Sequence, residues 1–262
     1  MLFLILASML LMASLSMVRP ALADGPPLVL QGFNGAGVVL GFSCFVAIAV
    51  IMGPLFSFAL LLAFMLHEFG HVMAHRMLGD EGARFRLIPF WNGARISQYT
   101  PETDLHAFFI ALMGPGLSLA PMVVSFALAE TLPGLSPIAA EFFWQFALAL
   151  GALNFVNLLP LWPLDGGRCI RLMVQSHFPQ MGPLAAAAMA AALFGFAYSV
   201  SSVLLALLAL VGAFSLITKR DEPPARDTLS RRELGIAFTA YFASLSAFFL
   251  GGWWVIKLIP LT

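Results

Sequence analysis

The sequence predicts an all-α polytopic membrane protein with about six to eight transmembrane helices and a small membrane-associated β-hairpin. Of its 262 residues, 61% are hydrophobic and 10% are charged, whereas a soluble domain averages about 45–50% apolar and about 25% charged residues. Apolar runs recur along the whole chain, and about 20 apolar residues are enough to span the hydrocarbon core. The formal net charge is zero, so no overall field attracts nucleic acid.

Eight apolar runs are candidate spans. They cover residues 1–18, 36–53, 55–78, 105–129, 141–162, 182–198, 201–218 and 233–259. Gly53–Pro54 separates the second run from the third, because proline ends or kinks a helix. The sixth and seventh runs are divided at residues 199–202 only because together they are too long for one span. We divide the chain into N-terminal transmembrane segments (1–54), a central transmembrane core (55–180) and C-terminal helices (181–262).

Basic residues predict the orientation of these runs, because cytoplasmic loops are enriched in Lys and Arg. Bases follow the third and fifth runs and lie between the seventh and eighth, whereas the connections after the fourth and sixth runs carry none. The clusters are Arg76, Arg84, Arg86 and Arg95, then Arg168 and Arg171, then Lys219, Arg220, Arg226, Arg231 and Arg232. Alternating spans place all of them on the cytoplasmic side, so the third run enters from outside.

The N-terminal apolar run could be either a cleaved signal peptide or a transmembrane helix. Residues 1–18 and the small residues at 21–23 resemble a signal peptide with its cleavage site. No base precedes the apolar stretch, and cleavage would reverse the third run, so we favour an uncleaved span.

Cys44 and Cys169 lie in or beside apolar segments without a pairing signal, so no disulfide framework is expected.

The third run contains His67-Glu-Phe-Gly-His71, an H-E-x-x-H pattern. Residues i and i+4 share one face of a helix, so the two imidazoles can reach one metal ion, and zinc is the expected metal. Glu68 is placed to act as general base towards a metal-bound water. Ionisable residues inside a span cost about 2.5–3.5 kcal/mol each on insertion scales, and metal coordination explains three of them within about one turn. His75, His106 and His177 lie near span ends, where interfacial positions are expected.

A catalytic zinc site usually has a third protein ligand. The acids in or beside the other runs are Glu130, Glu141, Asp165 and Glu233. Asp165 lies in NFVNLLPLWPLDGGR, residues 154–168, where prolines and glycines interrupt the apolar sequence. Broken helices at membrane depth occur where they line a cavity, so a carboxylate here suits a metal site. From these residues alone, a helix-end aspartate in a cytoplasmic turn remains an equal alternative.

The two motifs together, H67-E-F-G-H71 and N157-L-L-P-L-W-P-L-D165-G-G, resemble the site-2 protease family of intramembrane zinc metalloproteases. The resemblance covers roughly residues 55–180. It implies that His67, His71 and Asp165 are the ligands of one zinc ion per chain and that Glu68 is the catalytic base. It also implies a role near the substrate carbonyl for Asn157. The stretch G114-P-G-L-S118 resembles the family's Gly-Pro motif, in which some members carry asparagine in place of Ser118, so the role of this motif stays open.

The segment RFRLIPFWNGARISQYT, residues 84–100, contains Asn92–Gly93 between partly alternating runs, which is a hairpin signal. The family resemblance also suggests a membrane-associated sheet near the active site. An exposed strand edge there could pair with an unwound substrate. An interfacial loop without substrate contact is the alternative.

The function predicted from all of this is hydrolysis of peptide bonds in or near transmembrane segments. The partners are membrane-protein substrates and the lipid bilayer. Glu68 would take a proton from the zinc-bound water and pass it to the leaving amine. We expect a bacterial inner-membrane protein with its active site towards the cytoplasm. A non-proteolytic metal-binding scaffold or a transporter remains the alternative, whereas too few histidines cluster for a di-iron oxygenase.

Overall fold

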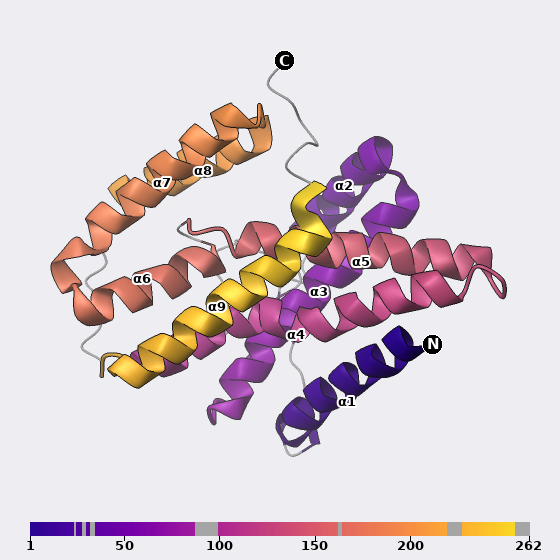
Figure 1. Ribbon diagram of the computed structural model, residues 1–262, viewed down its shortest axis with the longest axis horizontal. Coiled ribbons are helices and arrows are strands. Elements are labelled where there is room, and N and C mark those ends of the chain that lie inside the picture. The colour runs from indigo at the N-terminus through magenta and orange to yellow at the C-terminus, as the bar shows by residue number, and fades with distance from the viewer. Residues whose placement is uncertain are drawn as a thin grey trace. The chain divides into compact units, whose positions relative to one another are not determined.

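The computed structural model describes residues 1–23, 25–27, 30–31, 35–86, 99–161, 164–218 and 227–254, and helices dominate this part of the chain (Figure 1). In chain order the elements are α1 (Leu2–Ala23), β1 (Leu30–Gln31), α2 (Gly35–Met52), α3 (Pro54–Met77), β2 (Phe85–Arg86), α4 (Asp104–Thr131), α5 (Pro137–Asn157), α6 (Asp165–His177), a short 3₁₀ helix (Pro179–Met181), α7 (Gly182–Ser199), α8 (Val203–Thr218) and α9 (Arg231–Gly252).

The helical, multi-pass character of the chain is confirmed, and the described residues hold fewer long apolar helices than the six to eight predicted spans. Within the described residues, five helices are long and apolar enough to cross a membrane, namely α1, α3, α4, α5 and α9. The described parts of α2, α7 and α8 are apolar but shorter.

The predicted β-hairpin is wrong. β2 pairs in parallel with β1, with Leu30 opposite Phe85 and Gln31 opposite Arg86. The two arms of a hairpin run antiparallel, so this pairing is not half of one. The Asn-Gly signal is local, whereas the partner of β2 comes from the segment after α1. The Asn92–Gly93 turn itself lies outside the described residues.

The chain forms two units, and the first comprises Met1–Thr100 and Met113–Leu153. Its central helix is α3, which contacts α1, α2 and β2. The predicted break before α3 is confirmed: Gly53 adopts a φ of +91°, and Pro54 occupies the first turn of α3. This φ suits glycine, and a proline at a helix start removes an N–H that has no intrahelical partner anyway.

The second unit comprises Pro101–Leu112 and Asn154–Thr262. Within it α6 contacts α7 and α9, and α7 lies side by side with α8 (Figure 1). Ser176 of α6 donates a 3.0 Å hydrogen bond to the Asp104 carboxylate and accepts one of 3.2 Å from the Leu229 amide. This hydroxyl therefore links the starts of α4 and α9 to α6.

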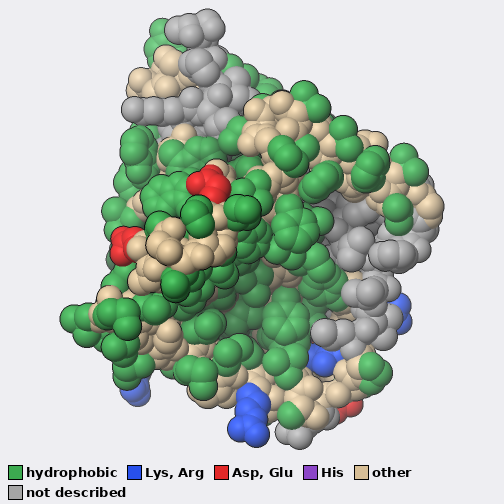
Figure 2. Space-filling model, turned by 90° about the vertical axis from the view of Figure 1, so that its right-hand side faces the viewer, with side chains coloured by type: hydrophobic (Ala, Val, Ile, Leu, Met, Phe, Trp, Pro, Cys, Tyr) green, Lys and Arg blue, Asp and Glu red, His purple; other side chains and the backbone are tan. Residues whose placement is uncertain are grey.

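Apolar side chains remain exposed on many helices, as a lipid-facing protein requires. Figure 2 shows a face on which hydrophobic side chains predominate and charged ones are few. Examples are Val50 and Ile51 of α2, 81% and 75% exposed, and Leu250 of α9, 78% exposed. In water such large apolar areas would mark association sites, but in a bilayer they contact acyl chains.

Candidate metal centre

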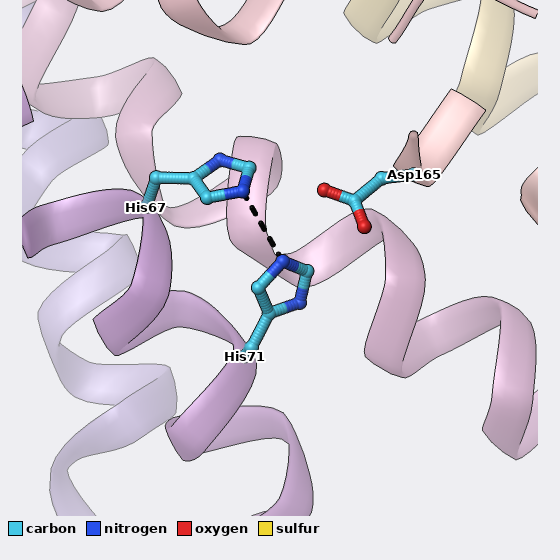
Figure 3. Close-up of side chains that lie close together, drawn as sticks. All are labelled: His67, His71 and Asp165. Atoms are coloured by element: carbon cyan, nitrogen blue, oxygen red, sulfur yellow. Dashed lines mark hydrogen bonds between the residues drawn. The ribbon is translucent and has the colours of Figure 1, made fainter. Parts of the chain in front are cut away.

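The H-E-x-x-H pattern lies in the second half of α3, where the helix is most enclosed. His67, Glu68 and His71 are each 4% exposed. Because i and i+4 share a helix face, the two imidazoles meet. Their Nε2 atoms lie 3.2 Å apart (dashed line in Figure 3), with ring planes nearly perpendicular at 86°.

This pair of nitrogens fits a zinc ion. Zinc–nitrogen bonds of about 2.0–2.1 Å in a tetrahedral site place two ligand atoms roughly 3.3 Å apart. The observed 3.2 Å between the Nε2 atoms matches that edge. Both rings therefore present their nitrogens at the spacing that one tetrahedral ion requires.

Two glycines allow α3 and α4 to approach closely at this point. A Cβ at Gly70 of α3 would collide with the Met113 carbonyl. A Cβ at Gly114 of α4 would lie 2.6 Å from Cε1 of His71 and 3.0 Å from Cε1 of His67. Gly114 thus leaves the space that the imidazoles occupy, a role that the sequence did not reveal for the Gly-Pro motif.

Ser118, the residue at which this motif varies, is fully buried. Its hydroxyl donates a 3.3 Å hydrogen bond to the carbonyl of Gly114, one turn earlier in α4. Such bonds to the i−4 carbonyl often bend a helix. Ser118 therefore acts on the backbone of the glycine that faces the histidines.

Asp165 is the first residue of α6 and is 5% exposed. The predicted interruption before it is confirmed, because α5 ends at Asn157 and α6 begins at Asp165. A carboxylate in the first turn is favoured by the helix dipole. Arg168 Nη1 lies 3.6 Å from Asp165 Oδ1. Burial raises the pKa of the neighbouring Cys169 thiol, and Asp165 raises it further, so that thiol stays protonated.

His67, His71 and Asp165, drawn together in Figure 3, are a set of buried residues that could hold a metal ion. Asn157 is the last residue of α5 and is half-buried.

The three histidines outside this cluster differ from one another in burial. His75, in the last turn of α3, is buried, with Nδ1 3.4 Å from Asp80 Oδ2 and its ring 6.2 Å from that of Tyr99. His106 is half-buried and His177 is exposed.

Comparisons with known proteins identify relatives that are similar to part of the chain. "Putative zinc metalloprotease Rip3" of Mycobacterium tuberculosis is 33% identical over 160 residues, which is 60% of this chain and 36% of that protein. "Stage IV sporulation protein FB" of Bacillus subtilis is 29% identical over 120 residues, 46% of this chain and 40% of that protein. The chain thus spans less than half the length of either relative.

A solved structure, the site-2 protease from Methanocaldococcus jannaschii, matches with a TM-score of 0.46 and 17% identity over 73% of this chain and 91% of that one. No family model matches the chain.

Proposed function

We propose that this chain is an intramembrane zinc endopeptidase of the site-2 protease type, a resemblance that its motifs predict and that is supported by its similarity to a relative named as a putative zinc metalloprotease. The observation that carries the proposal is the buried histidine pair on α3, with Nε2 atoms 3.2 Å apart and a buried glutamate next to it. Two imidazoles and a carboxylate are costly inside an apolar helix unless they share a function.

We assign His67, His71 and Asp165 as the ligands of one zinc ion. Support comes from the chemistry of the set, because two neutral imidazoles and one carboxylate form a typical catalytic zinc site with an open position. Zinc, when bound, acts as a Lewis acid and lowers the pKa of a water to about 7. All three side chains are buried, at 4–5% exposure, which keeps competing ligands from bulk solvent away.

Glu68 is assigned as the group that moves the proton. Its carboxylate accepts a proton from the attacking water and later donates it to the leaving amine nitrogen. A glutamate next to a histidine ligand in one helix turn is held at a fixed distance from the site by the helix itself. We assign Asn157 to the substrate carbonyl, since its amide is a hydrogen-bond donor on the last residue of α5.

The substrates that we propose are membrane proteins cut within or near a spanning helix. His67 lies about 20 Å along α3 from Pro54, at 1.5 Å per residue. With the orientation indicated by the basic clusters, this depth is past the midplane and towards the cytoplasm. Products would therefore leave on the cytoplasmic side of what we take to be a bacterial inner membrane.

The test compares wild type with Glu68→Gln, using Glu130→Gln as the matched control because Glu130 is exposed. Each purified protein is assayed for zinc and then incubated in proteoliposomes with a panel of single-span substrates. We expect about one zinc per chain in all three, and cleavage by wild type and Glu130→Gln only, since a general base contributes about 10²–10⁴-fold.

Other outcomes would each exclude part of the proposal. Equal cleavage by Glu68→Gln would show that a contaminating protease cuts the substrates. Zinc in all three proteins with no cleavage of any substrate would favour a metal-binding scaffold. A folded wild type without zinc would overturn the metal site itself.

A further inference from the structure

At the junction between α5 and α6, where Asp165 lies, the backbone carbonyl of Leu158 contacts both α9 and the first turn of α6. The Leu158 amide donates to the Asn154 carbonyl at 2.9 Å, and the Leu164 amide donates to that of Leu161 at 2.8 Å. These turns close the end of α5 and lead into α6. The Leu158 carbonyl belongs to the residue directly after α5, and carbonyls at a helix end need partners from outside the helix.

That partner is the hydroxyl of Tyr241 on α9, which donates a 2.7 Å hydrogen bond to the Leu158 carbonyl. Both residues are almost fully buried, at 1% exposure for Tyr241 and 0% for Leu158. A buried tyrosine hydroxyl almost always needs a partner, and an orphaned buried carbonyl is costly. Both the hydroxyl and the carbonyl therefore favour this hydrogen bond, because breaking it would leave two buried polar groups without it.

The same carbonyl also sets the position of α6. A Cβ at Gly166 would collide with the carbonyl group of Leu158 and crowd that of Leu159. The first turn of α6 thus rests directly on the carbonyl that Tyr241 holds, and Asp165 is the residue before this glycine. A shift of the Leu158 carbonyl would move Gly166, and with it the carboxylate of Asp165.

A second contact keeps α9 against this junction. The rings of Phe155 on α5 and Phe249 on α9 lie 5.5 Å apart in an edge-to-face arrangement. Phe248, next to it, is fully buried. Two turns of α9 are thereby fixed to the end of α5, so the tyrosine hydroxyl has little freedom to move.

We propose that Tyr241 is a positioning residue for the metal site: through the Leu158 carbonyl it fixes the first turn of α6 and so the orientation of Asp165. This inference rests on the proposed function, because it assigns Tyr241 to the zinc site described above. It gives α9, which contributes none of the proposed ligands, an indirect part in holding zinc.

The test is the rate at which zinc leaves the purified full-length protein when a chromogenic chelator is added. Tyr241→Phe keeps the ring and removes the hydroxyl, and Tyr198→Phe is the matched control because Tyr198 is 79% exposed. We expect about tenfold faster release from Tyr241→Phe, the lower end of the effect of losing an outer-shell partner of a metal ligand, and no change in the control. Gly166→Ala, which displaces α6 from the other side of the same carbonyl, should release zinc faster still.

A readout without zinc separates positioning from a general loss of stability. In metal-free Tyr241→Phe, amide hydrogen exchange should accelerate in peptides that cover Asp165–Cys169 and stay unchanged in peptides from α7. Unchanged zinc release in Tyr241→Phe, or exchange that rises equally in all these peptides, would overturn the inference and leave the proposed function standing. A folded wild type that binds no zinc would instead overturn the proposed function, and this inference with it.

Discussion

α1 and α3 belong to the same unit and would look alike on a hydropathy plot, but they are embedded very differently. In the most apolar 18-residue window of α1 the mean hydropathy is 2.0, and 11% of that window is buried. In the corresponding window of α3 the mean hydropathy is 1.6, and 50% of that window is buried. The less apolar helix is the one enclosed by protein. In a membrane, lipid solvates apolar side chains well, whereas the imidazoles and carboxylate of α3 need protein or metal partners. Polar content, more than hydropathy, therefore distinguishes the helix that carries the proposed metal ligands from the more exposed one.

The largest effect should come from removing a ligand on α3. His71→Ala deletes one of the two nitrogens that face each other at 3.2 Å. We expect loss of nearly all bound zinc and a fall in cleavage of at least about 10³-fold, since metal ligation and activation of water are lost together. Ser8→Ala changes a polar residue of α1 and serves as the control. Stoichiometric zinc in purified His71→Ala would contradict the assignment of this residue.

The next effect concerns the space beside those histidines. Gly114→Ala adds a methyl group that collides with the His71 ring and approaches His67. We expect zinc affinity to fall by about 10–100-fold, comparable to losing an outer-shell contact. Gly116→Ala is the matched control on the same helix, because its Cβ would make one ordinary van der Waals contact, with the Met113 sulfur at 3.8 Å. Competition with a zinc chelator measures both variants, and equal affinities would show that the rings can move aside at no cost.

A third comparison sets methionines of the two helices against each other. Met73 of α3 is 0% exposed and Met12 of α1 is 66% exposed. Met73→Ala leaves a cavity and should destabilise the fold by about 1–3 kcal/mol, less than in a soluble core because lipid is the reference for the lost transfer energy. Met12→Ala should stay within about 0.5 kcal/mol. Unfolding by steric trapping in bicelles measures both, and similar values would mean that α1 is as tightly packed as α3.

Much of this molecule follows from local sequence, and what does not follow depends on contacts between distant segments. The break at Gly53–Pro54 was predictable because φ preference and the missing proline N–H are properties of those two residues. The interruption before Asp165 was predictable for similar reasons. The parallel pairing of Phe85 with Leu30 was not, because it joins segments separated by two helices. The roles of Gly114 and Tyr241 were hidden likewise, since a collision with an imidazole or a bond to a carbonyl appears only once helices pack.

The smallest effect tests what holds α1 beside α3. Arg76, 9% exposed at the end of α3, donates a 2.7 Å hydrogen bond through Nη2 to the carbonyl of Pro26, in the segment that follows α1. A hydrogen bond from a charged donor contributes about 1.5–3 kcal/mol, but this one joins a helix that is otherwise little buried. Arg76→Gln should therefore speed hydrogen exchange in peptides of α1 about tenfold or more, while zinc content and exchange in residues 67–71 stay at wild-type levels. Faster exchange in both helices would show that α1 supports the metal-binding face after all, and the contrast between the two helices would then be one of exposure alone.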